Sequence, residues 1–182
     1  MTSGILTASG KWFDVLKPNP ALIDLADIAG ALSKLCRFGG HCQQFYSVAE
    51  HSILVSRLVR QRSSETPMAV AWGLLHDASE AYVVDIPRPV KRHLKEYIAI
   101  EDAIQQAVAE RFCLPWPMPA EVHSGDHDLL AMELRAYMPP QPDHLLQPLP
   151  TQPLRGGLRK RCLSPRLAER AFLDATKVLG LS

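Results

Sequence analysis

The sequence has few cysteines, almost no net charge and no long apolar run. Its four cysteines, Cys36, Cys42, Cys113 and Cys162, form no CxxC pair, and no secretory apolar segment opens the chain. We therefore expect free thiols and a cytoplasmic protein. The formal net charge of +1 argues against nucleic acid as the main ligand, because nucleic-acid-binding domains carry a clear basic excess. No apolar run approaches the roughly 18–20 residues that a membrane span needs, so we expect no membrane partner.

The chain is long enough for one domain with a core. It has 182 residues, of which 47% are hydrophobic and 21% are charged, as in ordinary globular proteins. Helical periodicity dominates, which predicts a single all-α bundle of six or seven helices over residues 1–182. The expected elements are an irregular segment over 1–23 in which Lys11–Val15 could pair as a small hairpin, helices over 24–35, 48–59, 67–82, 95–112, 119–138 and 165–179, and a proline-rich and basic loop over 139–162.

Two helix starts carry recognisable signals. The segment Ser47–Glu50 reads Ser-Val-Ala-Glu, the capping-box pattern. In that pattern the serine side chain caps the helix and the glutamate side chain reaches back to the first residue. The pair Thr66–Pro67 places a proline in the first turn of the next helix, where its missing N–H is harmless.

A polar pair, His76–Asp77, ends the apolar run Met68–Leu75. A charged pair there costs free energy unless something compensates it. A divalent metal ion is a natural compensation, because imidazole and carboxylate are both metal ligands. Adjacent residues on a helix point about 100° apart, so both reach one ion only at the helix edge or near its end.

Further polar residues extend this pair. Glu80 lies three residues after Asp77 and four residues after His76, on the same helix surface. His51 and Asp126 lie in other predicted helices, which suits an ion that bridges helices of a bundle. Two imidazoles and two carboxylates leave coordination positions open, as phosphate-ester hydrolysis requires. The structural alternative is that Asp126 and Asp128 only favour the start of their helix.

Three segments resemble the HD-domain phosphohydrolases in order and spacing. They are Phe45–Ser52, Leu74–Tyr82 and Asp85–Lys91. Within that superfamily they are most similar to the compact bacterial 5′-deoxynucleotidases and the phage dATP triphosphohydrolases. The resemblance covers roughly residues 12–138 and the last helix.

The resemblance implies an all-α fold with one divalent ion per chain, which would be Mn, Co, Fe, Ni, Zn or Mg. It implies these roles: His51, His76, Asp77 and Asp126 as metal ligands, Glu80 and Asp85 as catalytic acids, Arg37 and Lys91 as phosphate-binding residues, and Phe38 beside the sugar or base, where relatives carry Trp. Asp126 is preferred to Asp128 because the family helix has a glutamate seven residues after its aspartate, which here is Glu133.

The resulting hypothesis is a phosphohydrolase of deoxynucleoside 5′-phosphates, with a small-molecule nucleotide as its partner. One alternative releases triphosphate from a substrate such as dATP, and another is an inactive nucleotide-binding HD protein. A nucleic-acid contact through Arg155, Arg159, Lys160 and Arg161 is less favoured than a solvated face. A cysteine hydrolase is poorly supported, because Cys42 and His41 are adjacent. Relatives often form homo-oligomers, so self-association remains a hypothesis.

Overall fold

The computed structural model describes residues 3–62, 67–142, 144 and 148–181, and it confirms the predicted all-α fold. The described residues form six helices of eight residues or more, two single-turn helices and one small sheet. The elements are β1 (Gly4–Leu6), β2 (Trp12–Asp14), α1 (Leu25–Leu32), α2 (Val48–Arg62), α3 (Pro67–Leu75), α4 (Glu80–Val83), α5 (Arg88–Lys91), α6 (Lys95–Arg111), α7 (Ala120–Tyr137) and α8 (Pro165–Val178), with short 3-10 turns at Pro20–Leu22 and Arg37–Gly40.

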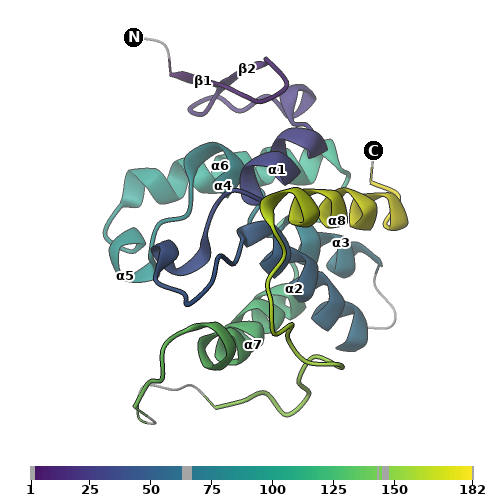
Figure 1. Cartoon of the computed structure of the whole chain (residues 1–182). Coiled ribbons are helices and arrows are strands. Elements are labelled where there is room, and N and C mark those ends of the chain that lie inside the picture. Colours follow the sequence, from purple (N-terminus) through teal and green to yellow (C-terminus); the bar gives the residue numbers. More distant parts are fainter. Residues whose placement is uncertain (1–2, 63–66, 143, 145–147, 182) are drawn as a thin grey trace.

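The predicted N-terminal hairpin is present at the top of Figure 1. Strands β1 and β2 pair antiparallel, with Ile5 opposite Phe13. Phe13 is fully buried and its ring stacks on Tyr82 at a centroid separation of 4.2 Å. The hairpin is thus fastened to the helical core by an aromatic contact rather than by its own two short strands, which would be marginal alone.

Helix α2 is the central element of the bundle. It packs against α3, α7 and α8, which surround it in Figure 1. A Cβ atom built on Gly73 of α3 would lie 2.9 Å from the Cα atom of Ser56, so α2 and α3 approach more closely than any side chain there would allow. Gly125 of α7 similarly faces Val59 of α2, with a built Cβ 3.0 Å from the Val59 Cγ2 atom.

The prediction of one continuous helix over 67–82 was wrong. Helix α3 ends at Leu75, and His76–Ser79 form a turn before α4. The buried side chain of Gln105 supports this turn: its Nε2 donates to the Leu75 carbonyl at 2.6 Å and its Oε1 accepts from the Ser79 N–H at 3.0 Å. An amide from α6 therefore satisfies backbone groups that the broken helix leaves open.

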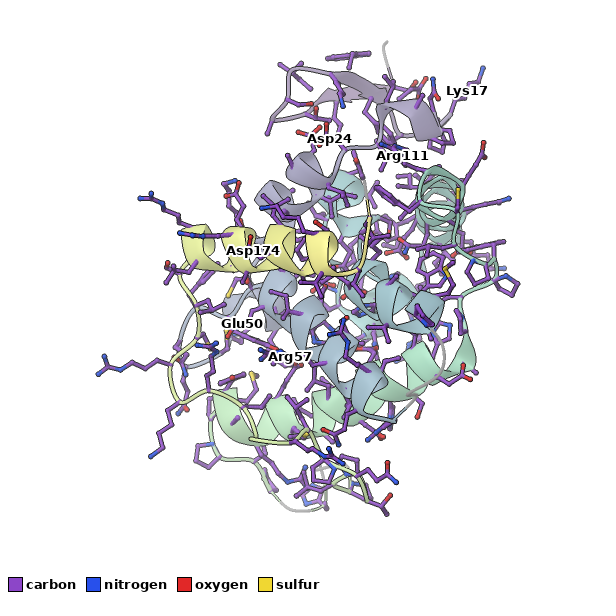
Figure 2. All side chains as sticks on the ribbon, turned by 90° about the vertical axis from the view of Figure 1, so that its right-hand side faces the viewer. Lys17, Asp24, Glu50, Arg57, Arg111 and Asp174 are labelled. Atoms are coloured by element: carbon purple, nitrogen blue, oxygen red, sulfur yellow. The ribbon has the colours of Figure 1, made fainter. Side chains whose placement is uncertain are left out.

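The capping box at the start of α2 forms only in part. The Ser47 hydroxyl accepts from the Glu50 N–H at 3.1 Å, as predicted. The Glu50 carboxylate instead accepts from the Leu163 N–H at 2.7 Å, so it does not reach back to Ser47. Figure 2 shows Glu50 and Arg57 on α2 below α8, which carries Asp174, and the three residues line a cavity of about 360 Å³.

The proline-rich and basic loop contains no helix over the described residues 139–142 and 148–162, and residues 143 and 145–147 lie outside the description. Its second half is anchored to the end of α2. The Gln61 side chain donates to the Pro153 carbonyl at 2.9 Å and accepts from the Arg155 N–H at 2.7 Å. Thr66 also lies outside the described residues, whereas Pro67 begins α3 as predicted. In the described part of the chain, each helix is too short or too polar for a bilayer span.

Candidate metal centre

Three predicted ligands converge at the end of α3. Among the described residues, His51, His76 and Asp77 form a group that could hold a metal ion, with ligand atoms all within 4.8 Å of one another. The Nε2 atoms of the two histidines lie 3.2 Å apart, and the Asp77 Oδ2 atom lies 3.2 Å from His76 Nε2 and 3.7 Å from His51 Nε2. Donor atoms about 2.1 Å from a common ion stand roughly 3.0–3.4 Å apart at right or tetrahedral angles. The two separations that involve His76 lie in this range, and the separation of His51 from Asp77 is slightly longer, so small side-chain movements would fit the three residues to one ion.

The break after α3 explains how adjacent residues share one centre. On a continuous helix His76 and Asp77 would diverge by about 100°. The turn that Gln105 supports instead lets both side chains face His51 of α2. The departure from the predicted helix is therefore what assembles the group.

The second ring nitrogen of each histidine has a fixed partner. The Nδ1 of His51 donates to Glu133 Oε1 at 2.6 Å, and the Nδ1 of His76 donates to the Gly73 carbonyl at 3.0 Å. These bonds orient both rings and turn the Nε2 lone pairs toward the centre, as in histidine-bound metal sites. Burial and Arg37 disfavour a charged His51, but Glu133 and Asp126 together raise the pKa of His51 to about 9. A metal ion must therefore displace a proton from this ring.

Glu133 of α7 is the fully buried support of His51. Its carboxylate also accepts from the Tyr46 hydroxyl at 2.6 Å and from Arg37 at 3.1 Å. Although burial opposes ionisation, Arg37 and His51 hold the pKa of Glu133 at about 2. The sequence marked Glu133 only by its distance from Asp126. Seven residues are about two helical turns, which places the two carboxylates on the same face of α7.

The structure places Asp126, and not Asp128, beside the histidines. The Asp126 Oδ1 atom lies 3.1 Å from His51 Nε2, and its Oδ2 atom accepts from Arg88 at 2.6 Å. Asp128 instead pairs with Arg62 at 2.6 Å. The Asp126 carboxylate thus contacts one ligand of the group while a cation holds its other oxygen.

A cavity of about 520 Å³ opens beside this centre. Its wall includes seven of the residues singled out from the sequence, which are Arg37, Phe38, Asp77, Glu80, Asp85, Lys91 and Asp126. His51 is fully buried and is not part of this wall, whereas His76 lines a second cavity of about 290 Å³ that shares Asp77 and Lys91 with the first. The larger cavity therefore exposes acids and cations beside the centre.

Two carboxyl groups in the wall have raised pKa values. Glu80 is buried, and its Oε2 atom has no hydrogen-bond partner among the described residues. Burial, together with Asp77 and Asp85, raises the pKa of Glu80 well above its ordinary value. Burial also raises the pKa of Asp85, although Arg37 opposes that shift. A raised pKa makes a carboxyl group better suited to hold and donate a proton, and the larger shift is that of Glu80.

The two predicted phosphate-binding cations already have partners. The Arg37 guanidinium is bound to Glu133 and lies 3.8 Å from Asp77, but its buried Nε atom has no partner in the described part of the chain. The Lys91 ammonium lies 2.5 Å from a Glu101 oxygen. Both residues still line the cavity, so their charges face any ligand within it.

Phe38 occupies a tight turn at the cavity rim. Its φ of 57° is in the left-handed region, and Gly39 follows at 59°. The Arg37 Cζ atom lies 5.4 Å from the Phe38 ring centroid. This turn presents an aromatic face next to the Arg37 side chain.

Three contributors were not singled out from the sequence, although Tyr46 lies inside the Phe45–Ser52 motif. Tyr46 and Gln105 act through hydrogen bonds to Glu133 and to the turn after Leu75, and Arg88 reaches Asp126 from a segment 38 residues away. Pairings over such distances depend on how the helices pack, which residue periodicity does not specify. Arg88 lies inside the Asp85–Lys91 motif, and that position is the one clue that could have suggested it.

The cysteine-hydrolase alternative gains no support from these contacts. The four cysteines are free, and Cys42 Sγ lies 3.5 Å from Cys36 Sγ and 3.7 Å from the Arg37 carbonyl. Burial and Cys36 raise the pKa of Cys42, which disfavours a thiolate nucleophile. The basic residues of the loop, Arg155, Arg159, Lys160 and Arg161, are exposed.

No family model matches the chain. The chain is 44% identical over 133 residues to the uncharacterized protein YfdR of Escherichia coli, across 73% of this chain and 71% of YfdR. It is 38% identical over 120 residues to the uncharacterized protein RCAP_rcc00048 of Rhodobacter capsulatus, across 63% of this chain and 60% of that protein. At this identity and coverage, the chain belongs to the family of YfdR.

Proposed function

We propose that this chain is a metal-dependent phosphohydrolase of the HD-domain type that acts on deoxynucleoside 5′-phosphates. One observation carries the proposal: His51, His76 and Asp77 converge beside a cavity lined by Glu80 and Asp85. A ligand group, acids and cations around one cavity are the parts that phosphate hydrolysis requires.

The ligand group has a defined chemical task in this proposal. A divalent ion held by His51, His76 and Asp77, with Asp126 adjacent, would neutralise phosphate charge and acidify a water molecule. Glu133 keeps the His51 ring in the orientation that the ligand group needs.

The cavity wall positions the substrate. Arg37 and Lys91 contribute positive charge toward a phosphate, and Phe38 offers an apolar surface for the sugar or base. Positioning and charge neutralisation supply most of phosphoryl-transfer catalysis. Because the guanidinium of Arg37 is held by Glu133, its charge is fixed in place before a substrate arrives.

In this proposal Glu80 and Asp85 hold and donate protons. Departure of a nucleoside leaves a 5′-oxygen that needs a proton, and a carboxyl group whose pKa is raised can donate one. Glu80 has this property and lies in the cavity wall near Asp77. Asp85 lies in the same wall and orients or shares that proton.

A product assay tests the proposal. Metal-stripped protein would be incubated with dAMP or dATP, with and without Mn²⁺ or Co²⁺, and the products separated by chromatography. We expect nucleoside and phosphate from dAMP. Nucleoside and triphosphate from dATP would reassign the reaction to the triphosphohydrolase type, and no turnover with any metal would reject nucleotide hydrolysis.

A matched pair of variants shows whether the product arises at this site. Asp126→Asn should reduce turnover strongly, because it changes the carboxylate beside His51. Asp128→Asn lies two residues away on the same helix and pairs with Arg62, so it should leave turnover nearly unchanged. Equal losses in both variants would locate the activity elsewhere.

A further inference from the structure

Arg88 has unusual surroundings for a cation in the cavity wall. Its side chain is 63% exposed, yet its guanidinium donates to Asp126 Oδ2 at 2.6 Å. Of the other two cations of the wall, Lys91 is held by Glu101, and Arg37 is bound to Glu133 and lies 3.8 Å from Asp77. Arg88 is the most exposed of the three, and it is paired with Asp126, the carboxylate beside the ligand group.

The two oxygen atoms of the Asp126 carboxylate have different partners. Its Oδ1 atom lies 3.1 Å from His51 Nε2, and its Oδ2 atom is held by Arg88. Among the described residues, the tight group of ligand atoms comprises His51, His76 and Asp77 without Asp126. A cation in that group would attract the Asp126 carboxylate and repel the guanidinium. Exposed ion pairs are weak, so this competition can break the contact between Arg88 and Asp126.

We propose that Arg88 is a displaceable phosphate-binding arm whose release depends on metal loading. Without a cation, it neutralises Asp126. With a cation in place, the freed guanidinium turns to phosphate in the cavity that it lines, where its planar fork can make two parallel hydrogen bonds. This inference rests on the proposed function in that it takes the ligand to be a phosphate compound.

This arrangement couples the binding of metal to the binding of phosphate. If metal frees Arg88 and Arg88 binds phosphate, then metal raises the affinity for phosphate. By thermodynamic reciprocity, phosphate raises the affinity for metal by the same factor. Removal of the side chain should therefore shift the two affinities in opposite directions, which a residue with a purely structural role would not do.

Calorimetric titration of Arg88→Ala tests this sign difference. In phosphate-free buffer we expect Mn²⁺ to bind roughly two- to fivefold more tightly than to the wild type, because the competing ion pair is gone. Inorganic phosphate should bind the Mn²⁺-loaded variant roughly tenfold more weakly. Arg92→Ala is the matched control, since it removes an exposed positive charge just after α5 at a residue outside the cavity wall. It should change neither affinity more than about twofold.

Three other results would count against this inference. Weaker Mn²⁺ binding by Arg88→Ala would show that Arg88 is a fixed support of Asp126 and would overturn the inference. Unchanged phosphate binding would overturn it as well, while leaving the proposed function intact if the wild type still binds phosphate. A wild type that binds Mn²⁺ but neither binds phosphate nor hydrolyses dAMP would reject both proposals together.

Discussion

Glu80 is a buried carboxyl group, 7% exposed. Burial first, and then Asp77 and Asp85, raise the pKa of Glu80, although Arg37 and Lys91 oppose the shift. An apolar residue would pack there at lower cost. Under the proposed function, this carboxyl group would supply the proton that the departing 5′-oxygen needs.

Glu80→Gln should preserve metal binding and lower kcat by roughly 10²–10⁴, because an amide of the same shape cannot transfer the proton. Steady-state kinetics with dAMP and a Mn²⁺ titration would measure the two quantities separately. Glu96→Gln, at an exposed position of α6, should leave both unchanged. Full turnover by Glu80→Gln would exclude the acid role.

Glu133 affects the candidate metal centre through its hydrogen bond with His51. Glu133→Gln should weaken Mn²⁺ binding by about 10–100-fold, because the neutral amide no longer fixes the His51 ring or its tautomer. Calorimetry gives the affinity, and Glu121→Gln in the exposed first turn of α7 is the control. An unchanged Mn²⁺ affinity would mean that the buried Glu133 carboxylate only holds Arg37 and Tyr46 in place.

Single residues also show what the sequence could predict. The ligating types and order of His51, His76 and Asp77 sufficed to predict a metal-binding group. The hydrogen bond from Arg88 to Asp126 did not follow from any pattern, because an exposed arginine has many candidate acids. The support that Glu133 gives to His51 needed the actual distance between α2 and α7.

Among elements, the contact between α2 and α3 has no room for one added methyl group at Gly73. Gly73→Ala should destabilise the fold by about 1–3 kcal/mol, because its new methyl group would lie 2.9 Å from Ser56 backbone. It should also weaken metal binding, since His51 and the turn that follows α3 would separate. Chemical denaturation measures the free energy of unfolding.

Gly30→Ala in α1 is the matched control for that substitution. There a built Cβ meets only the ends of flexible side chains, with Lys34 Nζ nearest at 3.5 Å. Alanine favours a helix over glycine by about 1 kcal/mol, so this variant should be neutral or slightly stabilised. Equal destabilisation by both changes would contradict the close-approach explanation for Gly73.

Helix periodicity predicted most elements to within a few residues, including α6, α7 and α8. It failed at Leu75, because no glycine or proline between Leu75 and Tyr82 marks the end of a helix. The break is stabilised by Gln105, which belongs to another helix, and a local pattern contains no record of that partner.

At the scale of the whole molecule, a bound ion should stabilise the native state. A hundredfold excess of Mn²⁺ over its Kd corresponds to about 2.7 kcal/mol. For a domain of this size that amounts to a rise in Tm of roughly 5–10 °C. Differential scanning fluorimetry in chelator and in Mn²⁺ measures the shift, and His76→Ala should abolish it. A wild-type Tm that stays unchanged with every divalent ion tested would argue against metal binding by the ligand group.

The ligand group also draws together parts of the chain that are remote in sequence. His51 and His76 are 25 residues apart, and His51 and its support Glu133 are 82 residues apart. No short segment contains the whole group, so tight metal binding would require α2, α7 and the turn after α3 to be docked. Metal affinity would therefore report on global folding as well as on the ligand chemistry. A chelator that removed a bound ion would release three segments that are distant in sequence.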